Sequence, residues 1–270
     1  MSLPSPLSRD FKDKLTQIIA RKGGLLLCTD FDGTLVTFTG TPSETSLPEE
    51  TRALLSELAA LEKLHLAIIS GRSFNELADL APIGGATIAG NHGLKIRFED
   101  GTNHELETGE KIHRAIAAMK QDLQEAAGGK EGIIIEDKSF GLALHYRKYE
   151  GNKEEIKKQF KQLWRKHSIA ELEVLEGAEL LEIRPGNWNK GDAVQLLQKK
   201  WGKLPTIYIG DDTTDEDAFE VLRGQELGIP IIVSQEEKVE TAAQHKLNNP
   251  EEVGELLKNI IEILSSTRPS

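Results

Sequence analysis

The sequence predicts an α/β fold, in which a parallel sheet covered by helices is interrupted by a smaller inserted α+β domain. Three observations predict it. Short apolar runs alternate with helical patterns over roughly the first third of the chain, and such alternation is typical of a parallel sheet with both faces covered. A helix–strand–strand pattern then occurs twice in the middle of the chain. After Pro185 and Gly186 the strand–helix alternation returns.

The first region supplies three strands of the predicted parallel sheet. Its strands are short apolar runs. Its second helix carries Leu54, Leu55, Leu58 and Leu61 at helical spacing, and Pro48 suits the first turn. In chain order we expect a helix at 11–21, a strand at 24–29, a helix at 48–62, a strand at 65–70, a helix at 73–80 and a strand at 86–90.

The middle region has a different order of elements. It opens with a β-ribbon that turns at Glu99–Gly101, and two helices follow, each succeeded by a pair of strands. A small sheet with both helices on one face satisfies this order. The expected elements are strands at 94–98 and 103–106, a helix at 109–127, strands at 132–136 and 139–147, a helix at 152–167, and strands at 171–176 and 179–184.

The last region completes the parallel sheet. We expect a helix at 190–201, a strand at 206–210, a helix at 216–224, a strand at 229–233 and a helix at 250–265. We therefore predict a discontinuous core domain made of residues 1–93 and 187–270. Residues 94–186 are predicted to form the inserted domain.

Asp30 and Asp32 directly follow the first apolar run, Leu25–Thr29. Residues two apart in an extended segment project to the same side, so both carboxylates can meet one cation and one anionic substrate at the end of the strand. Gly33 permits a sharp turn away from the strand, and Thr34 offers a hydroxyl to a phosphate. An isolated Asp-x-Asp pair is more often a solvated turn, so its interpretation depends on the segments that follow.

Three further polar segments lie at the ends of predicted strands or at the start of a predicted helix. Ser70–Arg72 ends the second strand, Lys190 opens the helix after the inserted domain, and Gly210–Asp217 is a dense acidic stretch after a strand. Ligands of open α/β sheets bind at the carboxyl ends of strands. A lysine at a helix N-terminus adds to the positive charge already there. Together the charges fit one phosphate and one divalent cation.

These four segments, in this order, resemble the four motifs of the haloacid dehalogenase superfamily. The resemblance implies a Rossmann-like core in which Asp30 is the nucleophile and Asp32 the general acid and base. It implies that Ser70 and Lys190 bind the transferring phosphoryl group. It also implies Mg²⁺ as the cofactor, held by Asp30, by the backbone carbonyl of Asp32, by Asp211, and by Asp215 directly or through water.

Composition agrees with a small-molecule enzyme. The 270 residues include 33 Lys and Arg against 44 Asp and Glu, a net charge of −11, which argues against a nucleic-acid or membrane surface. The single cysteine, Cys28, lies in a predicted strand and is expected to be a small core residue. No apolar run approaches the roughly 20 residues that span a bilayer. The N-terminus lacks a signal-peptide pattern, so we expect a cytoplasmic protein.

Six segments have a recognisable pattern: Gly90–Leu94, Glu136–Lys138, His145–Arg147, Leu181–Pro185, Asn189–Gly191 and Gly210–Phe219. Through them the chain is similar, over nearly its full length, to the trehalose-6-phosphate phosphatase family, whose inserted domain is a cap that binds the sugar. The acidic stretch and the His-Tyr-Arg run are the specific matches. Asn189 departs from the pattern, since Asp is more usual there.

The resemblance implies that polar loop and cap residues bind the substrate. They are Thr34, Gly71, Arg72, Asn91, His92, Glu136, Lys138, His145, Arg147, Glu182 and Arg184. Alternating charges on short strands suit a sugar with many hydroxyls, and they equally suit an exposed cross-strand salt-bridge network. His92 and His145 each fit either a ligand contact or a structural role.

The resemblance implies a magnesium-dependent phosphatase that hydrolyses trehalose 6-phosphate to trehalose and phosphate through an aspartyl-phosphate. A phosphatase of sucrose phosphate or a glycosylglycerate phosphate is an alternative, and so is a phosphohexomutase. A non-catalytic regulatory protein would be expected to have lost an acidic residue of the site, and this chain keeps them all. We expect a sugar phosphate substrate, no nucleic-acid or membrane partner, a trehalose-phosphate synthase as pathway neighbour, and a monomer.

Overall fold

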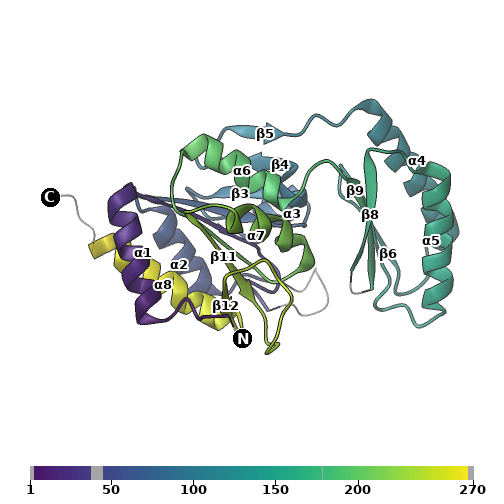
Figure 1. The fold of residues 1–270 in the computed structure, drawn as a ribbon. Coiled ribbons are helices and arrows are strands. Elements are labelled where there is room, and N and C mark those ends of the chain that lie inside the picture. The colour runs from purple at the N-terminus through teal and green to yellow at the C-terminus, as the bar shows by residue number, and fades with distance from the viewer. Residues whose placement is uncertain (1–2, 38–44, 178, 267–270) are drawn as a thin grey trace. The chain divides into compact units, whose positions relative to one another are not determined.

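The computed structural model describes residues 3–37, 45–177 and 179–266. The chain divides into two compact units, which are described separately. The larger unit consists of Met1–Glu105 and Asn189–Ser270, and the smaller unit of Leu106–Trp188. Figure 1 shows their elements along the chain.

The larger unit contains an eight-stranded sheet in the order β12-β11-β10-β1-β2-β3-β4-β5. The strands from β12 to β3 are parallel, and β4 and β5 are antiparallel additions at one edge. Their bounds are β1 Leu25–Thr29, β2 Leu64–Ile69, β3 Thr87–Gly90, β4 Lys95–Arg97, β5 Asn103–Glu105, β10 Thr206–Gly210, β11 Gly228–Val233 and β12 His245–Leu247.

Helices cover both faces of the parallel part, as the alternation of strand and helix predicted. Leu25 and Leu27 of β1 belong to a core cluster with residues of α1, α2 and α8, while α6 and α7 contact each other and pack on β1, β2, β10 and β11. The helices are α1 Arg9–Lys22, α2 Glu49–Ala59, α3 Phe74–Leu80, α6 Lys190–Trp201, α7 Glu216–Arg223 and α8 Pro250–Ser266. Strands buried on both faces are continuous apolar runs, and for this reason β1 was predicted correctly.

The ribbon formed by β4 and β5 corrects the predicted domain boundary. The sequence predicted that residues 94–106 open the inserted domain, but β4 pairs with β3, matching Ile88 with Arg97 and Gly90 with Lys95. The larger unit accordingly extends to Glu105. Backbone pairing decides the membership of a ribbon, and the sequence of a ribbon does not reveal its partner strand. The short strand β12, which carries two polar residues in three, was not predicted.

The smaller unit has a four-stranded antiparallel sheet in the order β6-β7-β9-β8. Helices α4 (Glu110–Ala127) and α5 (Lys153–His167) share an apolar cluster with one face of this sheet. The strands are β6 Ile134–Asp137, β7 Leu142–His145, β8 Leu172–Gly177 and β9 Leu180–Pro185. The predicted order, helix–strand–strand twice over, is confirmed.

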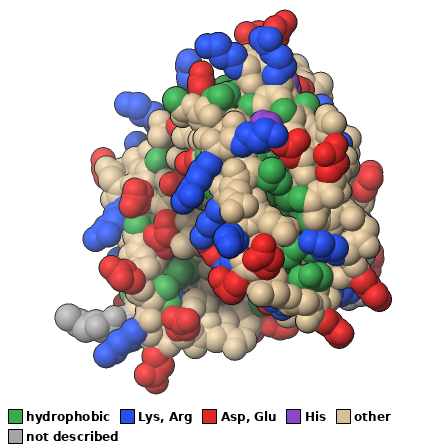
Figure 2. Space-filling view, turned by 90° about the vertical axis from the view of Figure 1, so that its right-hand side faces the viewer, with side chains coloured by type: hydrophobic (Ala, Val, Ile, Leu, Met, Phe, Trp, Pro, Cys, Tyr) green, Lys and Arg blue, Asp and Glu red, His purple; other side chains and the backbone are tan. Residues whose placement is uncertain are grey.

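Charges of both signs are mixed on the face drawn in Figure 2, where lysine and arginine side chains stand among aspartate and glutamate. No helix in the described part of the chain combines the length and the apolar content that a bilayer crossing needs.

Candidate active site

The predicted motif residues of the larger unit gather at the carboxyl edge of its parallel sheet. Asp30 follows β1, Ser70 follows β2 and Asp211 follows β10, while Lys190 begins α6. These strands are neighbours in the sheet. Parallel strands end at one edge, and residues far apart in sequence therefore meet there.

Lys190 lies at the centre of this cluster. Its Nζ donates to Asp30 Oδ1 at 2.7 Å and to Asp215 Oδ1 at 2.7 Å. The side chain of Lys190 is 2% exposed, and that of Asp215 is fully buried. An ammonium has three donors, so these two bonds leave one for a further acceptor. The start of α6 is fixed by Asn189, which forms a capping box with Asp192. The departure from the more usual Asp at 189 therefore preserves the helix start.

Asp215 accepts four hydrogen bonds. Its Oδ1 accepts from Lys190 Nζ and, at 2.6 Å, from the hydroxyl of Tyr208. Its Oδ2 accepts the backbone N–H groups of Asp211 and Asp212, both at 3.0 Å. A carboxylate has about four lone-pair sites, so these donors occupy its capacity. Asp215 thus holds the loop after β10 and the amine of Lys190 in place. Tyr208 was not predicted, although a tyrosine in a buried strand signals that its hydroxyl has a partner.

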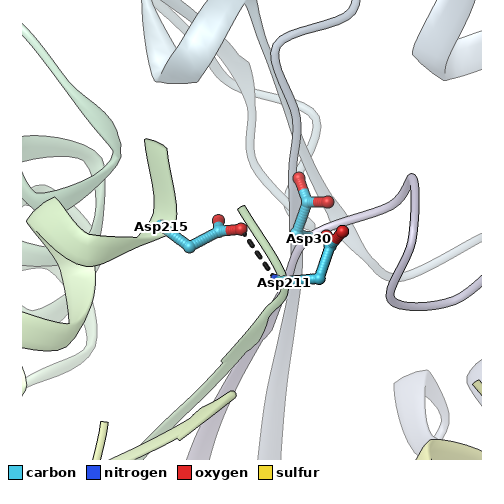
Figure 3. Close-up of side chains that lie close together, drawn as sticks. All are labelled: Asp30, Asp211 and Asp215. Carbon is cyan, nitrogen blue, oxygen red and sulfur yellow. Dashed lines mark hydrogen bonds between the residues drawn. The ribbon is translucent and has the colours of Figure 1, made fainter. Parts of the chain in front are cut away.

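Asp30, Asp211 and Asp215 form the acidic cluster of the site. One carboxylate oxygen from each lies within 4.8 Å of the others. Figure 3 shows the carboxyl groups of Asp30 and Asp211 close together, with Asp215 reaching the backbone of Asp211. Thr34 Oγ1 donates to Asp211 Oδ1 at 3.2 Å. Gly33 has φ +77°, and a Cβ there would lie 2.0 Å from Asp211 Oδ2; glycine at this turn makes the approach of Asp211 possible.

Burial and mutual repulsion raise the pKa values of Asp30 and Asp211. Burial raises the pKa of Asp30 well above its usual range; Lys190 lowers it, and the charges of Asp215 and Asp211 raise it again. Burial, with a further contribution from Asp215, raises the pKa of Asp211 to about 7. Burial alone would lower the pKa of Lys190, but the charges of Asp215 and Asp30 raise it above its ordinary value. The cluster is short of positive charge.

The residues of the cluster fit a divalent cation. When all three carboxyl groups are ionised, they carry three negative charges against one positive charge on Lys190, which leaves two. The donor atoms are hard oxygens, as magnesium prefers. Because the oxygens of Asp215 already accept four hydrogen bonds, Asp30 and Asp211 offer the better-placed free lone pairs.

The side chain of Asp32 pairs with Arg72. Arg72 donates from Nε to Asp32 Oδ2 at 2.6 Å and from Nη2 to Asp32 Oδ1 at 2.7 Å. Arg72 also contacts the carboxylate of Glu76. Arg72 was predicted to bind substrate; in the structure it binds two carboxylates. Glu76 was not predicted, although it lies four residues after an arginine, a spacing at which opposite charges often pair.

The loops after β2 and β3 are joined by backbone hydrogen bonds. The N–H of Asn91 donates to the carbonyl of Arg72 at 2.7 Å, and that of His92 to the carbonyl of Ser70 at 2.9 Å. Asn91 and His92 have φ values of 54° and 57°. Non-glycine residues in this region carry strain that clusters at functional sites. A Cβ on Gly71 would lie 2.7 Å from the ring of His92, so Gly71 is required for this packing.

Most of the predicted sugar-binding residues of the smaller unit gather on its sheet. Lys138 Nζ donates to Glu182 Oε2 at 2.8 Å, and both side chains are less than one-tenth exposed. Next to them, His145 Nε2 and Glu136 Oε2 lie 2.8 Å apart. Burial would raise the pKa of Glu136, but His145 and Lys138 lower it below its usual value.

Two predicted arginines of the smaller unit have separate partners. Arg184 Nε donates to Glu173 Oε1 at 2.8 Å, a cross-strand pair between β9 and β8. Arg147 lies 3.8 Å from Glu179, beyond the end of β7. The structure therefore brings Glu136, Lys138, His145 and Glu182 together, and it places the two arginines with other carboxylates.

Comparison with known proteins decides the family. Residues 28–252 match the family described as Trehalose-phosphatase. The chain belongs to the trehalose-phosphatase family. A trehalose-phosphate phosphatase of Mycolicibacterium paratuberculosis is 30% identical over 245 residues, which cover 87% of this chain and 61% of that protein. The probable trehalose-phosphate phosphatase 2 of Oryza sativa subsp. japonica is 31% identical, covering 95% of this chain and 72% of that protein.

Solved structures of this family have the same fold. The C-terminal domain of Candida albicans trehalose-6-phosphate phosphatase superposes with a TM-score of 0.78 at 22% identity, covering 96% of this chain and 98% of that one. The predicted fold class, a haloacid dehalogenase-type core with an inserted α+β domain, is confirmed. The chain spans only about 61% of the length of the mycobacterial family member.

Proposed function

We propose that this chain hydrolyses trehalose 6-phosphate to trehalose and phosphate, with magnesium, through an aspartyl-phosphate on Asp30. The observation that carries the chemistry is the buried contact of Lys190 with Asp30 at 2.7 Å, beside the carboxylate of Asp211. Membership of the trehalose-phosphatase family supports the substrate.

Magnesium is the cation that we propose for the acidic cluster. Asp30 and Asp211 would hold it, together with the backbone carbonyl of Asp32, and Asp215 would keep Asp211 and Lys190 in position. When bound, the ion supplies charge neutralisation on the phosphoryl oxygens and favours the anionic form of Asp30 that attacks phosphorus. The excess of negative charge in the cluster and the raised pKa values of Asp30 and Asp211 support this assignment.

In the first half of the proposed reaction, a carboxylate oxygen of Asp30 attacks phosphorus. The phosphorus–oxygen bond to the sugar breaks, and its electron pair leaves with the sugar oxygen, which takes a proton from the carboxyl group of Asp32. The amine of Lys190 and the hydroxyl of Ser70 donate to the phosphoryl oxygens, where charge accumulates. The products of this half are trehalose and the aspartyl-phosphate.

In the second half, a water molecule attacks the phosphorus of the aspartyl-phosphate and gives its proton to the carboxylate of Asp32. The bond between phosphorus and the oxygen of Asp30 breaks and restores the Asp30 carboxylate. Phosphate leaves, and Asp32 is again protonated for the next cycle. Both halves need Asp32 within hydrogen-bond reach of the oxygen that gains or loses the proton.

We propose that the polar face of the smaller unit recognises the sugar. Lys138 pairs with Glu182 at 2.8 Å, and both side chains are less than one-tenth exposed. Glu136 and His145 form a second, partly buried pair at 2.8 Å. Buried donors and acceptors discriminate strongly, since a ligand without matching hydroxyls leaves them unpaired. An exposed salt-bridge network would be solvated, but the Lys138–Glu182 pair is buried. Burying an ion pair has a desolvation cost that its own attraction often does not offset, so this burial supports a role in recognition.

The test is phosphate release from a panel of sugar phosphates, with magnesium and with a chelator, by the wild-type protein and by Asp30→Asn. Trehalose 6-phosphate should be hydrolysed fastest, only with magnesium, and not by Asp30→Asn. Faster release from sucrose phosphate or a glycosylglycerate phosphate would change the substrate. Isomerisation of a hexose phosphate that needs a bisphosphate activator would indicate a mutase, and no turnover of any ester would indicate a regulatory protein.

A further inference from the structure

Arg72 grips Asp32 by both of its carboxylate oxygens. The two hydrogen bonds, at 2.6 and 2.7 Å, come from Nε and Nη2, the two nitrogens on one edge of the guanidinium group. Two parallel bonds of this kind fix the plane of a carboxylate as well as its place, which a single bond does not. The side chain of Arg72 is 6% exposed and that of Asp32 23%, so the carboxylate remains open to the site while the arginine is covered.

The arginine is itself held from three sides. Its Nη1 contacts the carboxylate of Glu76 in the first turn of α3. Its guanidinium carbon lies 5.6 Å from the centre of the Phe31 ring, and its backbone N–H donates to Ser70 Oγ at 3.2 Å. Burial alone would lower the pKa of Arg72, but Asp32 and Glu76 raise it above its usual value. The guanidinium group of Arg72 is therefore permanently charged, held in place by its neighbours, and directed at the carboxylate of Asp32.

We infer that Arg72 is a positioning residue for Asp32: it holds the carboxylate at the place from which Asp32 takes the proton of the attacking water and protonates the sugar oxygen. This inference rests on the proposed function, because it presumes the acid–base role of Asp32. It differs from a phosphate-binding role for Arg72, in which the guanidinium would contact the phosphoryl group. In the positioning role, Arg72 does not contact the substrate and affects the reaction only by placing Asp32.

The inference predicts a defect that depends on the leaving group. p-Nitrophenyl phosphate needs little proton donation to release p-nitrophenolate, whereas a sugar oxygen needs a proton. In Arg72→Gln the aspartyl-phosphate should form from p-nitrophenyl phosphate at nearly the wild-type rate and then break down slowly. A rapid burst of p-nitrophenol followed by slow steady release is expected. With trehalose 6-phosphate the first step should slow by roughly 10- to 100-fold, the scale of a misplaced catalytic group.

Arg72→Lys keeps the charge if Arg72→Gln fails to fold. Lysine is a point charge that cannot form the two-pronged contact, so the same burst is expected from it. The matched control is Arg52→Gln on α2, whose arginine pairs with Glu49 at 3.5 Å; it should behave as wild type. The inhibition constant of inorganic phosphate should be unchanged in both Arg72 variants. The double variant Asp32→Asn, Arg72→Gln should be no slower than Asp32→Asn alone, because the two residues act as one unit.

Other results would overturn the inference. A weaker inhibition by phosphate, with equal slowing of the first step for both esters, would mean that Arg72 binds the phosphoryl group. A lower melting temperature without a burst would mean that the pair only stabilises the fold. Failure of the proposed function is seen separately, in the wild type: it would release no phosphate from trehalose 6-phosphate whatever the Arg72 variants do.

Discussion

Replacing Lys190 with methionine should destabilise the metal-free protein in a pH-dependent way. Methionine keeps the length of the side chain and removes the ammonium group, so Asp30 and Asp215 each lose a hydrogen bond of 2.7 Å to a buried cation. With Asp211 close by, three carboxylates then face one another without a compensating charge from Lys190.

The expected loss follows from the burial of these groups. Removing one partner of a buried ion pair costs about 3–5 kcal/mol, because the remaining charge is left unpaired. For a chain of this size each kcal/mol lowers the melting temperature by about 2–4 °C, so a fall of about 6–20 °C is expected at pH 8. The matched control, Lys199→Met, removes an exposed lysine of the same helix and should shift the melting temperature by little.

The stability difference between wild type and Lys190→Met should depend on pH. A carboxyl group whose pKa is raised by folding contributes stability below its ordinary pKa and loses it as the pH rises through the folded value. For Asp211 this stability is lost between about pH 4 and the folded pKa of about 7. The pKa of Asp30 is also raised by folding, so its contribution has the same sign. The gap between wild type and Lys190→Met should therefore be large at pH 8 and smaller at pH 5.

Calorimetric melting with a chelator present, at both pH values, measures this gap. A loss in Lys190→Met that is no larger than in Lys199→Met would refute the buried charge balance described here. An equal loss at pH 5 and pH 8 would show that packing, and not charge, explains the effect.

Three further predictions concern the cation, the sugar and the loop after β10. Magnesium should raise the melting temperature of the wild type more at pH 8 than at pH 5, since protons compete for Asp211, and calcium should support activity poorly; an equal shift at both pH values would contradict this. Glu182→Ala should lower the kcat/KM preference for trehalose 6-phosphate over p-nitrophenyl phosphate by roughly ten- to hundred-fold, the cost of a lost charged hydrogen bond. Arg147→Ala should lower it less, because Arg147 has a separate partner. Equal losses of kcat/KM for both esters would mean that these residues have only a structural role. Tyr208→Phe should destabilise the fold by about 1–3 kcal/mol in urea denaturation, and an unchanged unfolding free energy would mean that Asp215 does not depend on this hydroxyl.

The sequence by itself determined the layered core and the order of the elements. Buried parallel strands such as Leu25–Thr29 are continuous apolar runs, and helices such as Glu49–Ala59 repeat leucines at helical spacing. Both patterns are local, so they are visible without a partner. The positions of Asp30, Ser70, Lys190 and Asp211 at strand or helix ends were likewise visible, because the carboxyl edge of a parallel sheet is where such ends meet.

Only the tertiary structure decided what these side chains contact. The ribbon of β4 and β5 pairs with β3, so the larger unit extends to Glu105. Arg72 donates hydrogen bonds to Asp32. Asp215 accepts hydrogen bonds from Lys190, Tyr208 and the backbone. These contacts depend on which donors and acceptors reach the same place. Lys190 and Asp30, which are 160 positions apart in the chain, meet only after the sheet has formed. Local sequence patterns reveal the periodicity and the order of the elements, but they do not show which distant side chains will contact each other.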